Sequence, residues 1–279
     1  ASDWSSDVCS SDLDNHLILL KNVKAERVKM ADCSFSNIGG AVVYLTNTDN
    51  VIFERNTVRN TYGAALVSDN QSSGTKVIKN SFENLDLKMS NSHGLLIQGA
   101  DFLIEGNTFE NFSYSAIGVG NHYTKKGLKP CYGKILDNEI FLSGDYLQHP
   151  EQHTLMDGGA IYVWTQTDGI EIYNNYIHDI VGMKDNRGIF CDDGAKNVTI
   201  KGNIIERIHN GACISLRECA YVAPYVPDYN SGNTIEGNYV DGNVRFFKKD
   251  NTCKYDGSST TTSIGFYFSR AYWFWRKKR

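Results

Sequence analysis

A three-column pattern of apolar and polar positions repeats along most of the chain. An apolar residue is followed three positions later by Asn, and a second apolar residue comes two positions after the Asn. The Asn column consists of Asn56, Asn80, Asn107, Asn138, Asn175, Asn203 and Asn238, and Cys33 takes the same place one repeat earlier. The first apolar column consists of Met30, Phe53, Val77, Ile104, Ile135, Ile172, Ile200 and Ile235. The second consists of Phe35, Val58, Phe82, Phe109, Ile140, Ile177, Ile205 and Val240. The pattern predicts short strands on either side of a turn marked by Asn.

A further short apolar strand follows each Asn. These segments begin at Gly40, Gly63, Gly94, Ala116, Gly159, Gly188 and Gly211. The basic period is roughly 22 to 24 residues, within the range of solenoid repeats. One repeat has too few apolar residues to bury a face alone, so stacking on its neighbours must supply the core. Asn side chains stacked at one turn can also hydrogen-bond along their column and satisfy buried backbone groups. We therefore expect an all-β solenoid of about eight rungs.

Composition narrows the functional classes. The net charge of −4 and the pI near 6.0 give no electrostatic reason to expect nucleic acid or an anionic membrane as a partner. No apolar run reaches the length that spans a bilayer. The cysteines form no CxxC pair, so we expect no metal site of that kind. Cys33, Cys191 and Cys213 are predicted to lie in the stacked interior, and whether Cys219 pairs with Cys253 stays open.

Both ends of the chain differ from the repeats. Residues 3–13 (DWSSDVCSSDL) resemble the translation of a sequencing adapter, so residues 1–13 are expected to contribute nothing to the solenoid. The β-helix domain is predicted to span residues 14–250. Residues 251–279, which end in AYWFWRKKR, are expected to be irregular or truncated.

The Asn-turn pattern over about residues 24 to 245 resembles the pectate-lyase-like right-handed parallel β-helices. A leucine-rich repeat has a similar period, but its L-x-x-L-x-L frame and helical return segments are absent. The resemblance implies a right-handed parallel β-helix. It also implies a polysaccharide or oligosaccharide substrate, a secreted or periplasmic location and a monomeric chain. It does not fix the chemistry, because that superfamily holds lyases, hydrolases, epimerases and non-catalytic binders.

Two loop insertions suggest a binding face. The segments His122–Gly133 and Ser143–Gly158 flank the strand that carries Tyr162 and Trp164. Because side chains alternate along a strand, both aromatic residues are predicted to point away from the core. Exposed, they would stack on sugar rings; alternatively, a long loop folds over them and buries them. The remaining predicted substrate-binding residues are Asn121, His122, Arg187, Arg217 and Glu218.

Three carboxylates are the predicted catalytic residues. Asp192 and Asp193 end one strand in the segment GIFCDDG, and Asp157 precedes the neighbouring strand in DGGAIY. Neighbouring strands lie about 4.8 Å apart, which is compatible with the roughly 5 to 9.5 Å between the carboxyl groups of glycosidases. These segments resemble those of β-helix glycoside hydrolases. Asp-Gly is also ordinary turn chemistry, as Asp168-Gly169 illustrates.

Two other functions compete with hydrolysis. A polysaccharide lyase of this fold would use a Lys or Arg base, often with Ca²⁺, and only under that alternative is a cofactor expected. The candidates are Lys125, Lys126, Lys129, Arg187 and Arg217. A non-catalytic β-helix would bind glycans without needing carboxylates close together. Polygalacturonase activity is disfavoured, because no Gly-His-Gly or Arg-x-Lys motif follows Asp193.

Overall fold

The computed structural model describes residues 16–87, 93–121, 128–143, 157–164, 167–182, 184–217, 231–246 and 254–255. Within these ranges the chain forms three parallel sheets, here named A, B and C, of nine, nine and eight strands. Sheet A contains β1 (His16–Lys21), β4 (Ala41–Thr46), β7 (Leu66–Ser68), β10 (His93–Ile97), β13 (Ser115–Val119), β16 (Ile161–Val163), β19 (Arg187–Cys191), β22 (Ala212–Leu216) and β25 (Val244–Phe246). Sheet B contains β2 (Lys24–Ala31), β5 (Asp49–Glu54), β8 (Lys76–Ile78), β11 (Phe102–Glu105), β14 (Cys131–Leu136), β17 (Thr167–Tyr173), β20 (Thr199–Lys201), β23 (Thr234–Glu236) and β26 (Lys254–Tyr255). Sheet C contains β3 (Ser34–Ile38), β6 (Thr57–Thr61), β9 (Ser81–Leu85), β12 (Thr108–Phe112), β15 (Glu139–Ser143), β18 (Tyr176–Ile180), β21 (Ile204–Ile208) and β24 (Tyr239–Val240).

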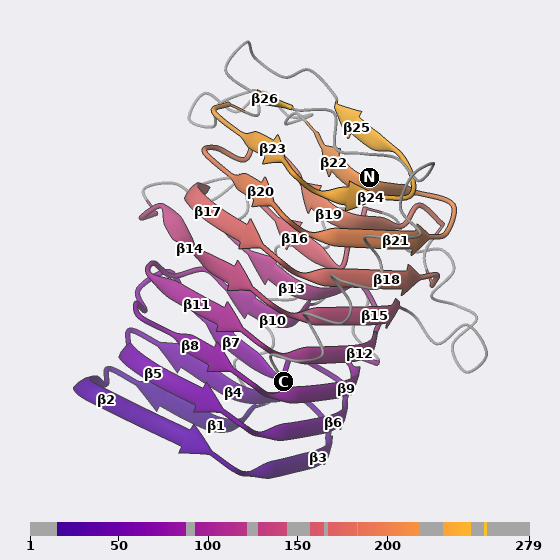
Figure 1. Ribbon diagram of the computed structural model, residues 1–279. Helices are drawn as coiled ribbons and strands as arrows, with labels where there is room; N and C mark the ends of the chain where they lie inside the picture. The colour runs from indigo at the N-terminus through magenta and orange to yellow at the C-terminus, as the bar shows by residue number, and fades with distance from the viewer. Residues whose placement is uncertain are drawn as a thin grey trace, which may run out of the picture.

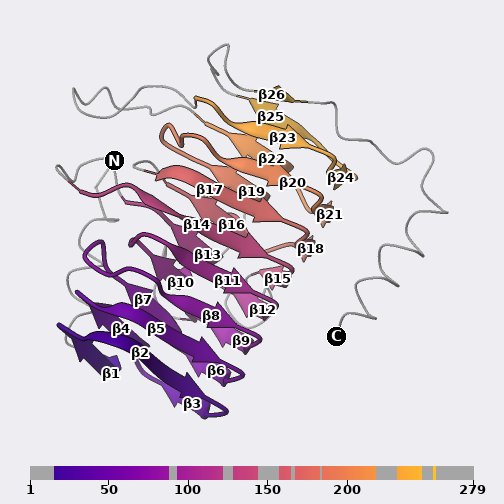
Figure 2. The same ribbon diagram turned by 60° about the vertical axis from the view of Figure 1, so that its left-hand side comes forward.

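The strands form the predicted right-handed parallel β-helix. Each rung runs through sheets A, B and C in turn, and each strand pairs with the equivalent strand of the next rung. Figure 1 shows the rungs rising from β1–β3 to β24–β26, and Figure 2 shows the same stack from the side. The described residues include no helix long and apolar enough to cross a membrane.

The predicted apolar columns line the interior. The sheet B column from Phe53 to Ile235 stacks in strand register and is at most 1% exposed. Rings of the first rungs stack on one another, with centroids 6.4 Å apart for Phe53 and Phe82 and 4.7 Å apart for Phe82 and Phe109. Fully burying one such side chain stabilises the fold by about 1.5–3 kcal/mol. The columns are therefore the main cohesive element of the solenoid.

The predicted Asn ladder is present at the turn between sheets B and C. The Asn107 backbone N–H donates to Asn138 Oδ1 at 2.9 Å, and Asn107 Nδ2 donates to the same oxygen at 3.0 Å and to the Val77 carbonyl at 2.9 Å. The same bonding runs from Asn56 to Asn238, all at most 3% exposed. The residue before each ladder position has a positive φ, which makes the tight turn.

The cysteine predictions were partly wrong. Cys191 and Cys213 are buried as expected, but Cys33 is exposed. Cys33 does take the ladder position, since its backbone N–H donates to Asn56 Oδ1 at 2.9 Å. It belongs to the first rung of the described stack, whose outer side no described rung covers, and the side chain is therefore exposed. Cys219 and Cys253 lie outside the described residues, as do residues 1–13 and, apart from β26, residues 251–279.

Candidate functional site

The outer face of sheet A carries the predicted aromatic residues. Tyr162 pairs in register with Gly118 on one side and Phe190 on the other, as the alternation of side chains predicted. Ile161 and Val163 point inward and are fully buried. Tyr162 and Trp164 therefore do point away from the solenoid core.

Of the two alternatives for Tyr162 and Trp164, exposure and burial, the structure shows burial. Their exposed fractions are only 3% and 7%, because they belong to a second hydrophobic cluster outside sheet A. Tyr162 makes edge contacts with Trp164, at 5.4 Å and 85° between rings, and with Phe190, at 5.1 Å and 83°. Such edge-to-face packing satisfies the rings within the protein. In this structure the two rings pack beneath the polar groups of the site, and neither ring has an exposed face on which a sugar could stack.

His93 completes this cluster and was missed by the sequence analysis. Its ring contacts Trp164 at 5.0 Å between centroids and Tyr114 and Tyr162 at 5.6 Å each. It occupies the space beside Gly118, where an added Cβ would come within 2.6 Å of the imidazole. Neither ring nitrogen has a hydrogen-bond partner among the described residues, and burial lowers the pKa of His93 to about 3. The imidazole is thus neutral at ordinary pH.

Asp192 is a buried carboxyl at the end of β19. Tyr162 Oη donates to Asp192 Oδ2 at 2.6 Å, and the Asp193 backbone N–H donates to Asp192 Oδ1 at 3.0 Å. Burial raises the pKa of Asp192, although the Tyr162 hydroxyl and the Arg217 charge act in the opposite direction. The environment therefore favours the protonated form more than water does.

Asp157, the second predicted carboxylate, is held from three sides. Tyr114 Oη donates to the Asp157 carbonyl at 2.9 Å, which fixes the backbone where φ is 66°. Its Oδ1 accepts from Arg217 Nη1 at 3.0 Å and from Arg187 Nη2 at 3.4 Å. The side chain is nevertheless 44% exposed. Asp157 thus combines a fixed position with access to solvent.

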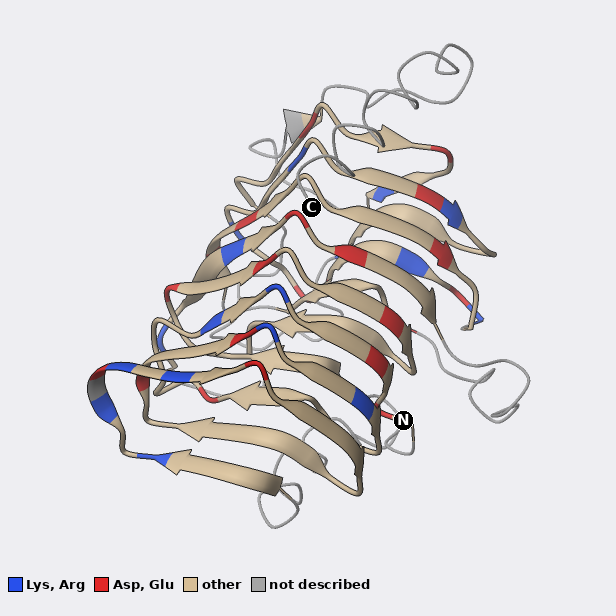
Figure 3. Ribbon diagram, turned by 60° about the horizontal axis from the view of Figure 1, so that its bottom comes forward, with Lys and Arg blue, Asp and Glu red and all other residues tan. Residues whose placement is uncertain are grey.

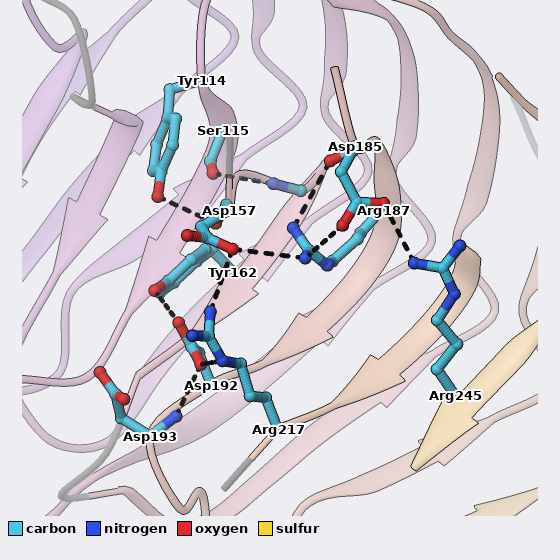
Figure 4. A network of polar contacts seen from close by, with 11 residues as sticks. Tyr114, Ser115, Asp157, Tyr162, Asp185, Arg187, Asp192, Asp193, Arg217 and Arg245 are labelled. Carbon is cyan, nitrogen blue, oxygen red and sulfur yellow. Dashed lines mark hydrogen bonds and ion pairs between the residues drawn. The ribbon is translucent and has the colours of Figure 1, made fainter. Parts of the chain in front are cut away.

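Arg217 joins the two carboxyls. It follows β22, and its Nε lies 3.9 Å from Asp192 Oδ1 while its Nη1 bonds Asp157. Figure 4 shows its guanidinium between Asp157 and Asp192, with Asp193 at the edge of the group. Three successive strands, β16, β19 and β22, therefore contribute to one site.

Asp185 and Arg245 extend the network along the solenoid axis, and neither residue was predicted. Arg187 Nη2 donates to Asp185 Oδ2 at 2.7 Å, and Arg245 Nη1 donates to Asp185 Oδ1 at 3.1 Å (Figure 4). Arg187 is only 5% exposed, and its guanidinium lies 4.1 Å from the centre of the Phe190 ring. Buried in this way, Arg187 is held in place and orients Asp157.

Of the remaining predicted substrate-binding residues, the structure describes only Asn121, which lies outside this network. Asn121 is buried after β13, where its Nδ2 donates to the Gln98 carbonyl at 3.2 Å and its Oδ1 has no partner among the described residues. His122 and Glu218 lie outside the described residues, as do most of the two insertions and the lyase candidates Lys125 and Lys126. Within the described ranges, no cluster of three or more His, Cys, Asp or Glu residues is arranged to hold a metal ion.

The family is established by comparison with known proteins. The model of the family described as "Right handed beta helix region" matches residues 14–88 and 70–268, and the chain belongs to that family. No curated protein matches the sequence.

A solved structure has the same fold. The A-module of the Azotobacter vinelandii mannuronan C-5 epimerase AlgE6 superimposes with a TM-score of 0.54 at 13% identity, over 88% of this chain and 79% of that one. The A-module of AlgE4 from the same organism gives 0.45 at 14% identity, over 88% and 72%. The Dettilon tailspike protein gives 0.30 at 14% identity, over 88% and 55%.

Proposed function

We propose that this protein is a carbohydrate-active enzyme that cleaves a polysaccharide or oligosaccharide by glycoside hydrolysis. The observation that carries the proposal is the contrast between two carboxyl groups on either side of Arg217. Asp192 is buried with a raised pKa, whereas Asp157 is 44% exposed and paired with two arginines. Glycosidases need one carboxyl group that is protonated and one that is ionised, and such contrasting environments provide them.

In this mechanism Asp157 supplies the carboxylate and Asp192 the proton. Asp157 acts on water or on the anomeric carbon, in a position fixed by Tyr114 and Arg187. Asp192 protonates the glycosidic oxygen, and the nearby Arg217 guanidinium stabilises the carboxylate that remains. Asp193 is the alternative acid, because its side chain is more exposed than that of Asp192.

The polysaccharide class has separate support. The AlgE6 module, which shares the fold, is by its name an epimerase of mannuronan, a polysaccharide. The polar network joins residues on or beside four successive strands of sheet A, from β16 to β25. Secretion or export to the periplasm and function as a monomer remain proposals that accompany this role.

The first prediction is that Asp157→Asn and Asp192→Asn each lower turnover by about 10² to 10⁴, the usual contribution of a positioned acid or base. Activity is measured as reducing ends released from a panel of plant and host polysaccharides. Asp193→Asn, measured in parallel, decides between the two acids. Asp101→Asn is the matched control, because Asp101 is an exposed turn residue with a φ of 55°, which Asn also tolerates.

Other outcomes favour the competing functions. Full activity in Asp157→Asn, Asp192→Asn and Asp193→Asn alike removes the carboxylate mechanism. Unsaturated products that disappear with a chelator indicate a Ca²⁺-assisted lyase. Binding of a polysaccharide without any product leaves a glycan-binding protein.

A further inference from the structure

Every guanidinium of the site network is already paired with a carboxylate. Arg187 bonds Asp185 and Asp157, and its exposed fraction is 5%. Arg217 bonds Asp157 at 3.0 Å and lies 3.9 Å from Asp192. Arg245 bonds Asp185 at 3.1 Å. A carboxylate on a substrate would thus meet arginines whose charges are already compensated by internal carboxylates.

The network also has no excess of positive charge. Three of its carboxyl groups (Asp157, Asp185 and Asp192) contact its three guanidinium groups, and the charge of a fourth, Asp193, acts on Arg217 from the edge of the group (Figure 4). Protonating Asp192 brings the net charge of the cluster to zero, so the cluster is not cationic in either state. Along the ribbon in Figure 3, the Lys and Arg positions of the described residues are interspersed with Asp and Glu positions. Complementary charge recruits a polyanion, and the site network does not provide it.

From this arrangement we propose that the site takes a chain of uncharged sugars and rejects uronate and sulfated residues at the cleaved position. The inference rests on the proposed function and adds the substrate class to it. Carboxylates serve an uncharged sugar well, because Asp157 and Asp193 can accept hydrogen bonds from its hydroxyl groups. A uronate placed there would bring a like charge against them, which opposes binding.

The test uses polymers that differ only in their carboxyl groups: mannuronan and polygalacturonate, each compared with its carboxyl-reduced product. Binding of the wild-type chain is measured by affinity electrophoresis, and cleavage is measured separately as reducing ends. We expect at least one reduced polymer to bind at least about tenfold more tightly than its uronate parent, a difference of about 1.4 kcal/mol. That binding should not change between about 0.01 M and about 1 M salt, although the screening length falls from about 30 Å to about 3 Å.

A charge variant provides the control. Lys184 is an exposed cation on the turn before Asp185 and has no place in the network. Lys184→Gln should leave the binding of an uncharged polymer unchanged, whereas it would weaken a polyanion that is held electrostatically.

The outcomes separate this inference from the proposed hydrolysis. If either polyuronate binds more tightly than its reduced product, or is cleaved, the inference is overturned and hydrolysis stands. The same holds if binding of a reduced polymer weakens with salt or in Lys184→Gln. Binding of a reduced polymer without reducing ends supports the inference and overturns hydrolysis. No binding of either reduced polymer counts against the inference.

Discussion

At the scale of single residues, Asp192 shows how burial and hydrogen bonding compete. Its carboxyl is 5% exposed, so desolvation penalises the charged form and raises the pKa. The Tyr162 hydroxyl and Arg217 stabilise the charged form, but they offset burial only in part. Burial also raises the pKa of Tyr162, so its hydroxyl remains a hydrogen-bond donor to Asp192.

This balance predicts a specific pH dependence of stability for Asp192→Asn. The folded protein holds the Asp192 proton to a higher pH than the unfolded chain, whose carboxyl titrates near 3.8. The stability that this group contributes is therefore complete below that pH and declines as pH rises through the folded pKa. Asn does not titrate, so the melting temperature of Asp192→Asn relative to wild type should increase from pH 4 towards neutral pH. A difference that stays constant or decreases with pH would show that the pKa is not raised.

For His93, the pH dependence of stability has the opposite sign. Its folded pKa, about 3, lies below the ordinary 6.5, so its contribution is complete above pH 6.5 and is lost as pH falls towards 3. His93→Phe keeps an aromatic ring beside Gly118 and removes two buried nitrogens that have no partner among the described residues, a relief on the order of 1 to 3 kcal/mol. We expect the variant to be more stable than wild type, and by a growing margin in acid, in denaturant titrations between pH 7 and 4. Parallel curves at all pH values would mean that His93 is not buried neutral.

At the scale of strands and turns, the fold could be predicted because its rules are local and repeated. One Asn, with apolar residues at fixed offsets, defined each turn and the two strands around it, and the structure has the same columns in register. If the register of one repeat had been assigned wrongly, the repeats on either side would have shown the error. The exposure of Cys33 could not be predicted, because it depends on what covers the first rung and not on the repeat itself.

The site was only partly predictable, because its contacts join distant rungs. The sequence indicated Asp192 and Asp193 because they directly follow β19, and Asp157 because it precedes the neighbouring strand β16. The burial of Tyr162 depends on His93, which lies two strands away on β10. The one available signal was Gly118, the small residue between Leu96 and Tyr162 in the outer column.

The charged partners were missed for a different reason. Asp185 and Arg245 lie in a turn and on a short strand, where isolated charges are normally solvated. Only the folded chain places both against Arg187 and converts ordinary surface charges into a network. In this protein, therefore, periodic features follow from the sequence, whereas features that depend on contacts between rungs require the structure.

At the scale of the whole molecule, the Asn ladder and the strand pairing of the described residues connect adjacent rungs. Each ladder Asn from Asn56 to Asn203 bonds to the rungs directly before and after it, and each inner strand pairs with its two neighbours. Stability in such a fold is approximately a sum of rung and interface contributions. A change far from β16–β22 should therefore cost stability without altering the site.

Asn56→Ala and Asn175→Ala test this directly, because they remove the same bonds at different places. Asn56 donates to Asn80 and to the Met30 carbonyl, and Asn175 donates to Asn203 and to the Ile135 carbonyl. Each substitution leaves buried partners unsatisfied and should lower the free energy of unfolding by about 1 to 3 kcal/mol. Only Asn175 belongs to the rung of β16–β18, whose strand β16 directly follows the segment that carries Asp157.

We therefore expect both Asn variants to unfold at lower denaturant concentration, and only Asn175→Ala to lose polysaccharide binding or turnover measured well below its melting temperature. Equal functional loss in both would show that strain travels along the solenoid, contrary to nearest-neighbour coupling. Unchanged stability in Asn175→Ala would instead show that the ladder contributes little. In that case the stacked apolar columns alone would hold the rungs in register, and the site would depend on core packing and not on the turns beside it.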